Sequence, residues 1–364
     1  MADFFEIDFL DVESDKSGDA IAIRYEIGGR TFIHVVDGGF QATGESLAAH
    51  IRKFYGAPRR IDHVVATHPD GDHAGGLRTI LEEFEVGALW ILRPWLYAGE
   101  IIGRFENFIS VENLKTRLKD CYPNIAALEE IALRRNIPIY EPFQGAAIGA
   151  FRVLAPTRAR YLDLIVDSER TPEAAEQAER GTGAVIAALL GRAAAKLVAF
   201  AKAAWGAEAF SPDDVSAENE MSLVQYAALC GKRILLTADA GRGALSEAAD
   251  YAPAAGLTLP GIDRFQVPHH GSRRNVSTEL LDRWLGPRLA AQPEKGKELF
   301  HALISSAKKD EAHPRKAVVR AMIHRGGSVA TTEGKTVRSS LNAPNREGWM
   351  AVTPLPYPDE QEED

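Results

Sequence analysis

The chain has 364 residues, of which 45% are hydrophobic and 26% are charged. This composition is typical of a folded protein with a sizeable core and excludes a disordered chain. Two distant cysteines, Cys121 and Cys230, exclude a disulfide framework and a cysteine-ligated zinc site, and they favour a reducing, cytoplasmic compartment. No basic segment followed by an apolar run opens the sequence, so we expect no signal peptide. The most apolar window, residues 183–201, contains Arg192 and Lys196 near its middle, so we expect no membrane-spanning helix.

The charge is distributed unevenly along the chain. The net charge of −9 argues against indiscriminate binding to nucleic acid. Residues 262–346, however, contain 16 Lys and Arg against 8 Asp and Glu, a net +8, so the rest of the chain carries −17. This basic region would suit an anionic substrate, although solvated surface residues would give the same count.

The first 90 residues predict three strands, a helix and a short buried strand. The strands are expected at residues 4–12, 20–27 and 31–36, the helix at 45–55 and the buried strand at 61–66. The buried strand delivers Thr67 and His68 to its carboxyl end, where sites form in sheets backed by helices. Further along, we expect helices at 77–84 and 110–136, strands at 88–92, 222–228 and 233–237, and two strands joined at Gly149 within residues 143–154.

Residues 157–214 differ in character because they are charged, alanine-rich and without strand signals. We predict that they form a helical insertion, which would act as a cap or as a contact with a protein partner or a second copy. Residues 354–364 are proline-rich and then acidic, which predicts disorder. The expected organisation is one domain over residues 1–345, interrupted by the insertion, and an acidic tail over residues 346–364.

A cluster of metal-ligating residues follows the short buried strand. His68, Asp70, Asp72 and His73 offer four ligands within six residues, and Gly71 allows the backbone to turn between them. Packing such groups together without a cation would leave unpaired charge. A solvated polar turn is the plainer alternative, which the density of ligand residues disfavours.

Two later strands end in residues of the same kind. The strand at 233–237 is followed by Asp239, and the strand that ends at Val267 is followed by His269 and His270. One strand that ends in aspartate is unremarkable. Three strand ends that offer histidine and aspartate in one chain indicate a shared site.

Together these runs resemble the metallo-β-lactamase superfamily, and within it the soluble hydrolase domain of ComEC-type DNA-uptake proteins and their stand-alone relatives. That branch's HxDxDH motif is present at residues 68–73 and its VPHHGS motif at residues 267–272. Residues 236–240 resemble its LLTGD, with Ala238 in place of glycine. Weaker matches to DVGxGDA, IDxG, NxxSLV, ISxGxN and GHP lie at residues 11–20, 35–39, 219–224, 304–308 and 312–314.

The resemblance covers residues 4 to about 340 apart from the insertion, and it implies an α+β fold, a four-layer αββα sandwich with two divalent ions between the sheets. His68 and Asp70 would bind the first ion. The second would take Asp72, His73 and one histidine of the later pair, and Asp239 would bridge both. His269 is favoured over His270 because it comes first off the strand, although the sequence leaves the choice open. Asp37 would orient the ligands.

Two departures from the family pattern concern the first ion. The family's third-motif histidine has no counterpart, and Asn219 is the nearest matching residue; Asp70 stands where the hallmark has its second histidine. Oxygen ligands favour Mn²⁺ or Mg²⁺ relative to Zn²⁺. We therefore expect zinc or manganese, with magnesium as a further option.

The resemblance implies a metal-dependent hydrolase that uses a metal-bound hydroxide, with Asp72 in the catalytic centre. A phosphodiester in a nucleic acid or nucleotide is the favoured substrate, which would make the protein a phosphodiesterase or nuclease. Lys308, His313 and Ser272 would bind or protonate the leaving oxygen, and Arg273 and Asn219 would also contact the substrate.

Two other functions remain open on the sequence alone. The protein could hydrolyse another ester or an amide, as a lactonase does, because the superfamily uses one site for many bonds. It could also be a regulatory or partner-binding module on the same fold, which the complete ligand set disfavours.

Overall fold

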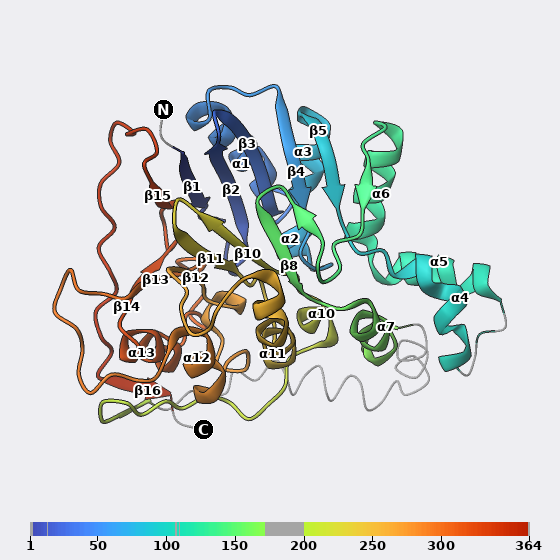
Figure 1. Ribbon diagram of the computed structural model, residues 1–364. Coiled ribbons are helices and arrows are strands. Elements are labelled where there is room, and N and C mark those ends of the chain that lie inside the picture. Colours follow the sequence, from blue (N-terminus) through green and yellow to red (C-terminus); the bar gives the residue numbers. More distant parts are fainter. Residues whose placement is uncertain (1–2, 13, 106–107, 109, 172–199, 363–364) are drawn as a thin grey trace.

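The computed structural model describes residues 3–12, 14–105, 108, 110–171 and 200–362. Within them, two seven-stranded sheets pack against each other and helices cover the outer face of each sheet (Figure 1). This arrangement confirms the predicted αββα sandwich. None of the helices in the described residues has both the length and the apolar character needed to cross a membrane.

The first sheet has the strand order β15-β1-β2-β3-β4-β5-β6. Its pairs are antiparallel from β15 to β3 and parallel from β3 to β6. Helices α1 and α3 contact it through β2 and β3. The strands are β1 Phe4–Phe9, β2 Ala20–Ile27, β3 Arg30–Gly38, β4 Arg60–Val65, β5 Glu85–Trp90, β6 Ile139–Tyr140 and β15 Val337–Leu341. The helices of this half are α1 Thr43–Phe54, α2 Gly71–Ala74, α3 Leu77–Glu83, η1 Pro94–Tyr97, α4 Ala98–Ile101, η2 Ile102–Arg104, α5 Val111–Cys121 and α6 Pro123–Arg134.

The second sheet has the order β14-β13-β12-β11-β10-β8-β7, and its strands β11 to β14 are parallel. Helix α11 contacts β8 and β10, and α13 contacts β14. The strands are β7 Ala147–Ile148, β8 Phe151–Ala155, β10 Val224–Leu229, β11 Lys232–Leu236, β12 Arg264–Gln266, β13 Phe300–Ile304 and β14 Gly327–Thr331. The helices of this half are α7 Arg158–Asp167, α10 Ala217–Glu220, α11 Arg242–Tyr251, η3 Ala252–Ala255, η4 His269–Gly271, α12 Thr278–Leu285 and α13 Lys316–His324.

Alternation along the strands of the second sheet separates two hydrophobic cores. In β10, Ala227 and Leu229 join the core shared with the first sheet, whereas Val224 and Tyr226 join the core beneath α11 to α13. Successive side chains of a strand point to opposite faces, so each strand needs apolar residues on both faces here. This accounts for the continuous apolar runs that predicted these strands.

The parallel pairing brings distant segments to one edge. Because β3 and β4 run parallel, and β11, β12 and β13 run parallel, the carboxyl ends of each group lie together. The chain leaves these ends in short loops and short helical turns, α2 and η4 among them, which present their polar side chains at this edge.

The predicted helical insertion at 157–214 is only partly described, because residues 172–199 lie outside the described residues. Helix α7 confirms helix at its start. Its end is not helical: residues 200–202 form the strand β9 Phe200–Lys202, and residues 203–216 contain no helix. Strand β9 pairs with β16 Glu360–Glu362 in a separate two-stranded sheet, so it is not a strand of the sandwich.

The prediction of a disordered acidic tail is wrong for the part that the structure describes. Glu362 is buried and accepts hydrogen bonds from the backbone N–H groups of Lys316 and Ala317 at the start of α13. A carboxylate is favourable there because a helix begins with unpaired N–H groups and positive dipole charge. The acidic residues thus contribute to the domain, whose end lies beyond residue 345.

Arg346, at the start of the C-terminal segment, forms ion pairs with strand β1 of the first sheet. Its guanidinium lies 2.8 Å from Glu6 and 2.7 Å from Asp8, and both carboxylates are fully buried. Arg346→Ala would leave two buried carboxylates short of a partner, so we expect the free energy of unfolding to fall by about 3–5 kcal/mol in urea titrations. Arg59→Ala, which breaks an exposed pair with Glu85, should cost about 1 kcal/mol or less. Equal effects of the two variants would contradict the prediction.

Candidate metal centre

The candidate ligands gather where the strand ends of the two sheets meet. Asp37 lies at the end of β3, His68 follows β4, and α2 carries Asp72 and His73. From the second sheet, Asp239 follows β11, and His269 and His270 follow β12. Donor atoms lie within 4.8 Å of one another in three groups: Asp37, His68 and His73; Asp72, His73 and His270; and Asp19, His73 and Asp239.

Asp239 lies at the centre of the cluster, and its two oxygens face different rings. Oδ1 lies 3.3 Å from Nε2 of His73 and 3.6 Å from Nε2 of His270. Oδ2 lies 3.5 Å from Nε2 of His269 and 3.9 Å from Nε2 of His68. The histidines therefore form two pairs, one for each oxygen of the same carboxylate.

Each pair is joined by one further aspartate. Asp72 Oδ2 lies 3.9 Å from Nε2 of His270, and Asp70 Oδ2 lies 3.9 Å from Nε2 of His68. These pairwise contacts divide the residues around Asp239 into two sets, of which the second contains the compact group Asp72, His73 and His270. Each set contains two imidazole nitrogens and two carboxylate oxygens.

Hydrogen bonds at the opposite ring nitrogen orient the histidines from the first sheet. His73 Nδ1 lies 2.8 Å from Asp37 Oδ2 and donates to it. The hydroxyl of Thr67 donates to the same oxygen of Asp37 and accepts from Nδ1 of His68, 3.0 Å away. With the hydrogen on Nδ1, Nε2 of each ring presents a lone pair to Asp239.

The histidines from the second sheet are held in the same way. His270 Nδ1 donates to the backbone carbonyl of Ser305 at 2.9 Å. His269 Nδ1 lies 3.0 Å from Oδ1 of Asn275, whose amide group donates to the carbonyls of Asp239 and Ala240. Those two bonds fix the orientation of the Asn275 side chain, so its oxygen accepts from His269 and leaves Nε2 bare.

This donor set fits divalent cations. Nε2 of His68, His73 and His270 and Oδ1 of Asp239 are buried without a hydrogen-bond partner in the described residues. Lone pairs that face carboxylate oxygens repel unless positive charge lies between them. The separations of 3.3–3.9 Å are those of donor atoms that share an ion at about 2.0–2.2 Å.

The electrostatics of the cluster depend on the histidines and carboxylates together. Burial favours the neutral ring of His73, but the carboxylates of Asp239 and Asp37 raise its pKa well above the usual value. Burial also opposes ionisation of Asp239, yet the surrounding histidines hold its pKa well below the usual value. Burial raises the pKa of Asp19, which lies beside His73, to about 7. A proton between His73 and Asp239 thus competes with a divalent ion for the same carboxylate.

The backbone at the site adopts positive φ values at residues that are not glycine. Asp37, Ala238, His269 and His270 have φ of 57°, 46°, 48° and 55°. Such left-handed conformations cost energy for residues with a Cβ atom and concentrate at functional sites. Ala238 stands where the LLTGD motif has glycine, and its positive φ gives the physical reason why glycine suits that position.

The structure reverses the preference for His269 at the second ion. His270, not His269, faces Asp72 and the oxygen of Asp239 that His73 faces. His269 faces the other oxygen of Asp239, on the side of His68. The two rings diverge because Nδ1 of each is hydrogen-bonded to a different loop.

Two further residues contact members of the first donor set. Asn219, the nearest match to the family's third-motif histidine, places its carboxamide 3.1 Å from Nδ1 of His269. Arg170 forms an ion pair of 2.8 Å with Oδ1 of Asp70, which leaves Oδ2 for the centre. His269 places a second imidazole nitrogen beside Oδ2 of Asp239, on the side of His68.

Of the predicted catalytic and substrate-binding residues, His313 lies at the cluster. Its ring is stacked against that of His269, with centroids 5.8 Å apart. Ser272 is buried directly after the histidine pair, and its hydroxyl accepts from the backbone of Arg274. Arg273 donates to the carbonyl of Ala209, and Lys308 is an exposed residue.

The sequence did not identify the residues that form hydrogen bonds or ion pairs with the candidate ligands and with His313. Asp310 contacts His313, and Ser17 contacts Asp310. Asn275 and Arg170 contact candidate ligands. Asp310 lies three residues before His313, a spacing that could have suggested a shared turn. Arg170 gave no signal, because its partner lies 100 positions earlier in the chain.

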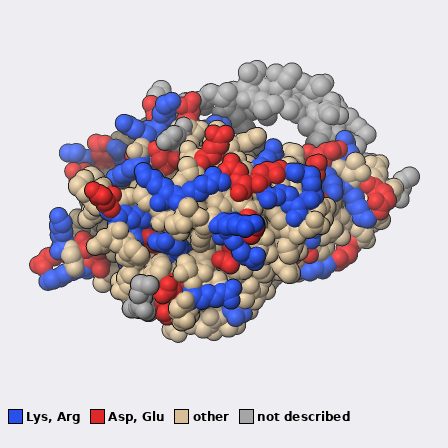
Figure 2. Space-filling view, turned by 90° about the horizontal axis from the view of Figure 1, so that it is seen from above, with Lys and Arg blue, Asp and Glu red and all other residues tan. Residues whose placement is uncertain are grey.

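Much of the positive charge at residues 262–346 is paired with acidic residues elsewhere. Arg325 is fully buried against Glu208, and Arg338 and Arg346 bind Glu6. On the face drawn in Figure 2, Lys and Arg are interspersed with Asp and Glu. The net +8 of this region therefore largely reflects internal ion pairs.

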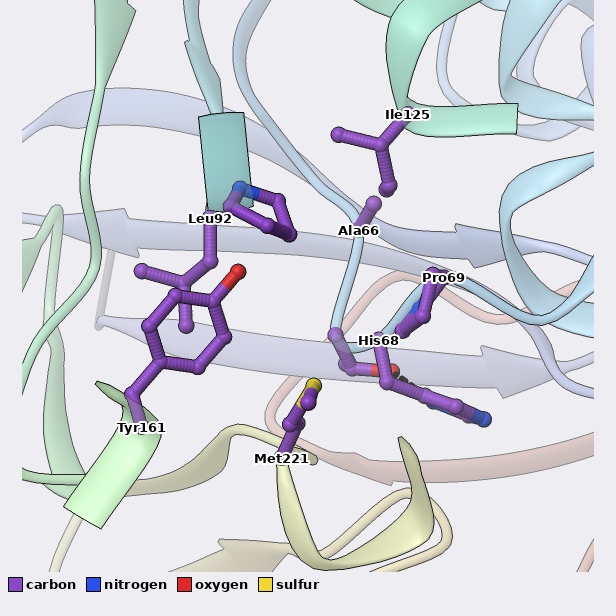
Figure 3. Close-up of a pocket in the computed structure, with 9 residues that line it drawn as sticks. Ala66, His68, Pro69, Leu92, Ile125, Tyr161 and Met221 are labelled. Atoms are coloured by element: carbon purple, nitrogen blue, oxygen red, sulfur yellow. Dashed lines mark hydrogen bonds between the residues drawn. The ribbon is translucent and has the colours of Figure 1, made fainter. Parts of the chain in front are cut away.

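A small apolar pocket lies beside His68, and Figure 3 shows its imidazole pointing away from Leu92 and Tyr161. The pocket is lined by Ala66, Thr67, His68, Pro69, Leu92, Pro94, Ile125, Tyr161 and Met221. Its buried apolar side chains pack beside the strand end that carries His68.

Comparisons with known proteins add a family match over part of the chain. Residues 16–111 match the family model described as the metallo-beta-lactamase superfamily. No curated protein matches the sequence.

Similar solved structures include a hydrolase named AbOPH in the beta lactamase superfamily, at 12% identity and a TM-score of 0.31. That match covers 61% of this chain and 56% of AbOPH, so the chain spans little more than half of that protein. Another is metallo-beta-lactamase SMB-1 bound to 2-mercaptoethanesulfonate, at 10% identity and a TM-score of 0.29, covering 70% and 78% of the two chains. With TM-scores this low, neither likeness bears on function.

Proposed function

We propose that this member of the metallo-beta-lactamase superfamily, a metal-dependent hydrolase, cleaves phosphodiester bonds in nucleotides or nucleic acid. The observation that carries the proposal is the division of Asp239 between two donor sets, one at each carboxylate oxygen. A phosphodiester suits such a pair because its two non-bridging oxygens can contact two neighbouring cations.

The residues of the two sets would hold one ion each. The first set is His68, Asp70, His269 and Oδ2 of Asp239; the second is Asp72, His73, His270 and Oδ1 of Asp239. Divalent ions bound there would lower the pKa of a water and offset the negative charge on the oxygens of the attacked phosphate.

The composition of the first set bears on the choice of metal. Asp70 supplies oxygen where the family hallmark has histidine, and His269 restores one nitrogen. Two nitrogens and two oxygens are acceptable to both Zn²⁺ and Mn²⁺. We therefore expect manganese to support activity at least as well as zinc.

The chain's own side chains would place the substrate and manage its protons. Asp37, Thr67, Asn275 and the carbonyl of Ser305 keep the ring hydrogens on Nδ1, so that the opposite nitrogens stay available as ligands. His313, whose ring lies against that of His269, would supply a proton to the leaving oxygen.

A substrate panel with controlled metal content tests the function. EDTA should abolish cleavage of bis(p-nitrophenyl) phosphate, a dinucleotide and single-stranded DNA, because the centre's donor atoms lose their cations. Added Mn²⁺ should restore cleavage at least as well as Zn²⁺. Full activity in EDTA, with no metal found by elemental analysis, would rule out the two-ion centre.

Hydrolysis of a neutral ester such as a lactone is the second candidate. It stays a candidate because the superfamily uses one site to hydrolyse many kinds of bond. A lactone in the same panel decides between the two, because each proposal expects its own substrate to have the higher kcat/KM.

A further inference from the structure

His313 is held at one end by a carboxylate that is itself fixed in place. Its Nδ1 lies 3.1 Å from Oδ2 of Asp310. The same oxygen accepts from the hydroxyl of Ser17 at 2.7 Å and from the backbone N–H of Ser17 at 3.1 Å. The other oxygen of Asp310 accepts from the backbone of Ala312 at 3.0 Å.

The direction of these bonds is set by the surroundings. The backbone N–H of Ala307 donates to the Ser17 hydroxyl at 3.0 Å, so that hydroxyl directs its hydrogen to Asp310. Ser17 is almost fully buried. Although burial raises the pKa of Asp310, the hydrogen bonds from His313 and Ser17 lower it well below the usual range. Asp310 therefore stays an acceptor, and Nδ1 of His313 must carry a hydrogen.

The ring of His313 lies between this support and the candidate metal centre. Its centroid is 5.8 Å from that of His269, with the planes at 26°, and 6.2 Å from that of His270. Its side chain is 22% exposed, and Nε2 makes no hydrogen bond to a described residue. A carboxylate behind Nδ1 fixes the tautomer and the orientation of the ring, as in other carboxylate–histidine pairs.

We propose that Asp310 and Ser17 are positioning residues that hold His313 as the proton donor to a strongly basic leaving oxygen, so that the natural substrate is a phosphodiester with a sugar alkoxide as leaving group. This inference rests on the proposed phosphodiesterase function. A leaving group that departs readily without a proton would need no such support.

Hydrolysis of the phosphodiester conserves atoms and charge. A water oxygen forms the new bond to phosphorus, and the bond from phosphorus to the sugar oxygen breaks with its electron pair on that oxygen. The sugar oxygen takes the proton from Nε2 of His313 and leaves as an alcohol. The proton that the water releases passes to solvent, from which His313 is protonated again.

A structural role for Asp310 alone makes a different prediction. Its bonds to Ser17 and Ala312 tie two loops together, and losing them could disturb the site for every substrate equally. Loss of proton donation affects only a leaving group that needs a proton. Dependence on the leaving group therefore separates the two roles.

The test compares two phosphodiesters in the Mn²⁺-loaded enzyme. A dinucleotide releases a sugar alkoxide, whereas bis(p-nitrophenyl) phosphate releases a weakly basic phenolate. Asp310→Asn should lower kcat for the dinucleotide by about 100-fold and for the p-nitrophenyl ester by less than about 3-fold. Ser17→Ala should give a smaller loss of the same kind, and Ser17→Thr should restore it.

Controls show whether the effect is specific. Metal content should stay at the wild-type level in every variant. Asp15→Asn, which removes an exposed carboxylate paired with Lys309, should leave both substrates unaffected. Should Asp310→Asn fail to fold, His313→Gln should show the same dependence on the leaving group.

The outcomes separate this inference from the function on which it rests. Equal losses on both substrates, or none, with metal retained, would overturn the role of Asp310 and leave the phosphodiesterase proposal standing. Failure of the wild type to cleave either ester would overturn both.

Discussion

Asp239→Asn should lose both ions and lower kcat/KM by at least about a thousandfold, because one carboxylate is shared by the two donor sets. Its oxygens face Nε2 of His73 and His270 on one side and of His269 and His68 on the other. The amide has one neutral oxygen in place of two anionic ones. It therefore cannot bind two cations, one at each oxygen, or offset their charge.

Elemental analysis of the purified variant provides the direct measurement, and the thermal transition shows whether it is folded. Asp250→Asn, which alters an exposed carboxylate paired with Arg283, is the matched control and should keep both ions. Near-normal turnover in Asp239→Asn, or two ions still bound, would contradict the shared-carboxylate arrangement.

The sequence was sufficient for the parts of the site in which ligands are neighbours along the chain. His68 to His73 occupy a strand end and the short helix after it, so their proximity is a local property. The pair after β12 carries an equally compact motif. The parallel pairing of β11 with β12 then follows from buried apolar strands, and it brings Asp239 to the same edge.

The sequence was insufficient where a contact depends on the path of a loop. Which histidine faces which oxygen of Asp239 is decided by Asn275 and by the carbonyl of Ser305, and both lie in other loops. Adjacent histidines at positive φ direct their rings differently, and no pattern in the sequence contains that information.

Charge counting was limited for a related reason. The basic excess of residues 262–346 left open whether it forms a surface for an anion, and Arg325 and Arg346 pair with Glu208 and Asp8, more than 100 positions away. Composition reports how many charges a segment has and cannot report which are paired. The acidic tail was misjudged in the same way, since Glu362 is buried at the start of α13.

The second large effect concerns the adjacent histidines, whose removal should affect different ions. His270→Ala removes a buried nitrogen that faces Asp72 and Oδ1 of Asp239, so the second ion should be lost and the first retained. His269→Ala removes the nitrogen that faces Oδ2, so the first ion should be lost and the second retained. Each variant should bind about one equivalent of Mn²⁺ where the wild type binds two, and kcat should fall by about a hundredfold or more.

Calorimetric titration of the metal-free protein with Mn²⁺ distinguishes the two cases. We expect the wild type to give two binding steps and each single variant to give one. His269→Ala combined with His270→Ala should bind neither ion tightly, because each donor set then keeps a single histidine, His68 or His73. If His269→Ala instead retained two tightly bound ions, the first set would not need its nitrogen. Asp70, held by Arg170, and His68 would then suffice together with Asp239, and the site would depend more strongly on oxygen ligands and on manganese.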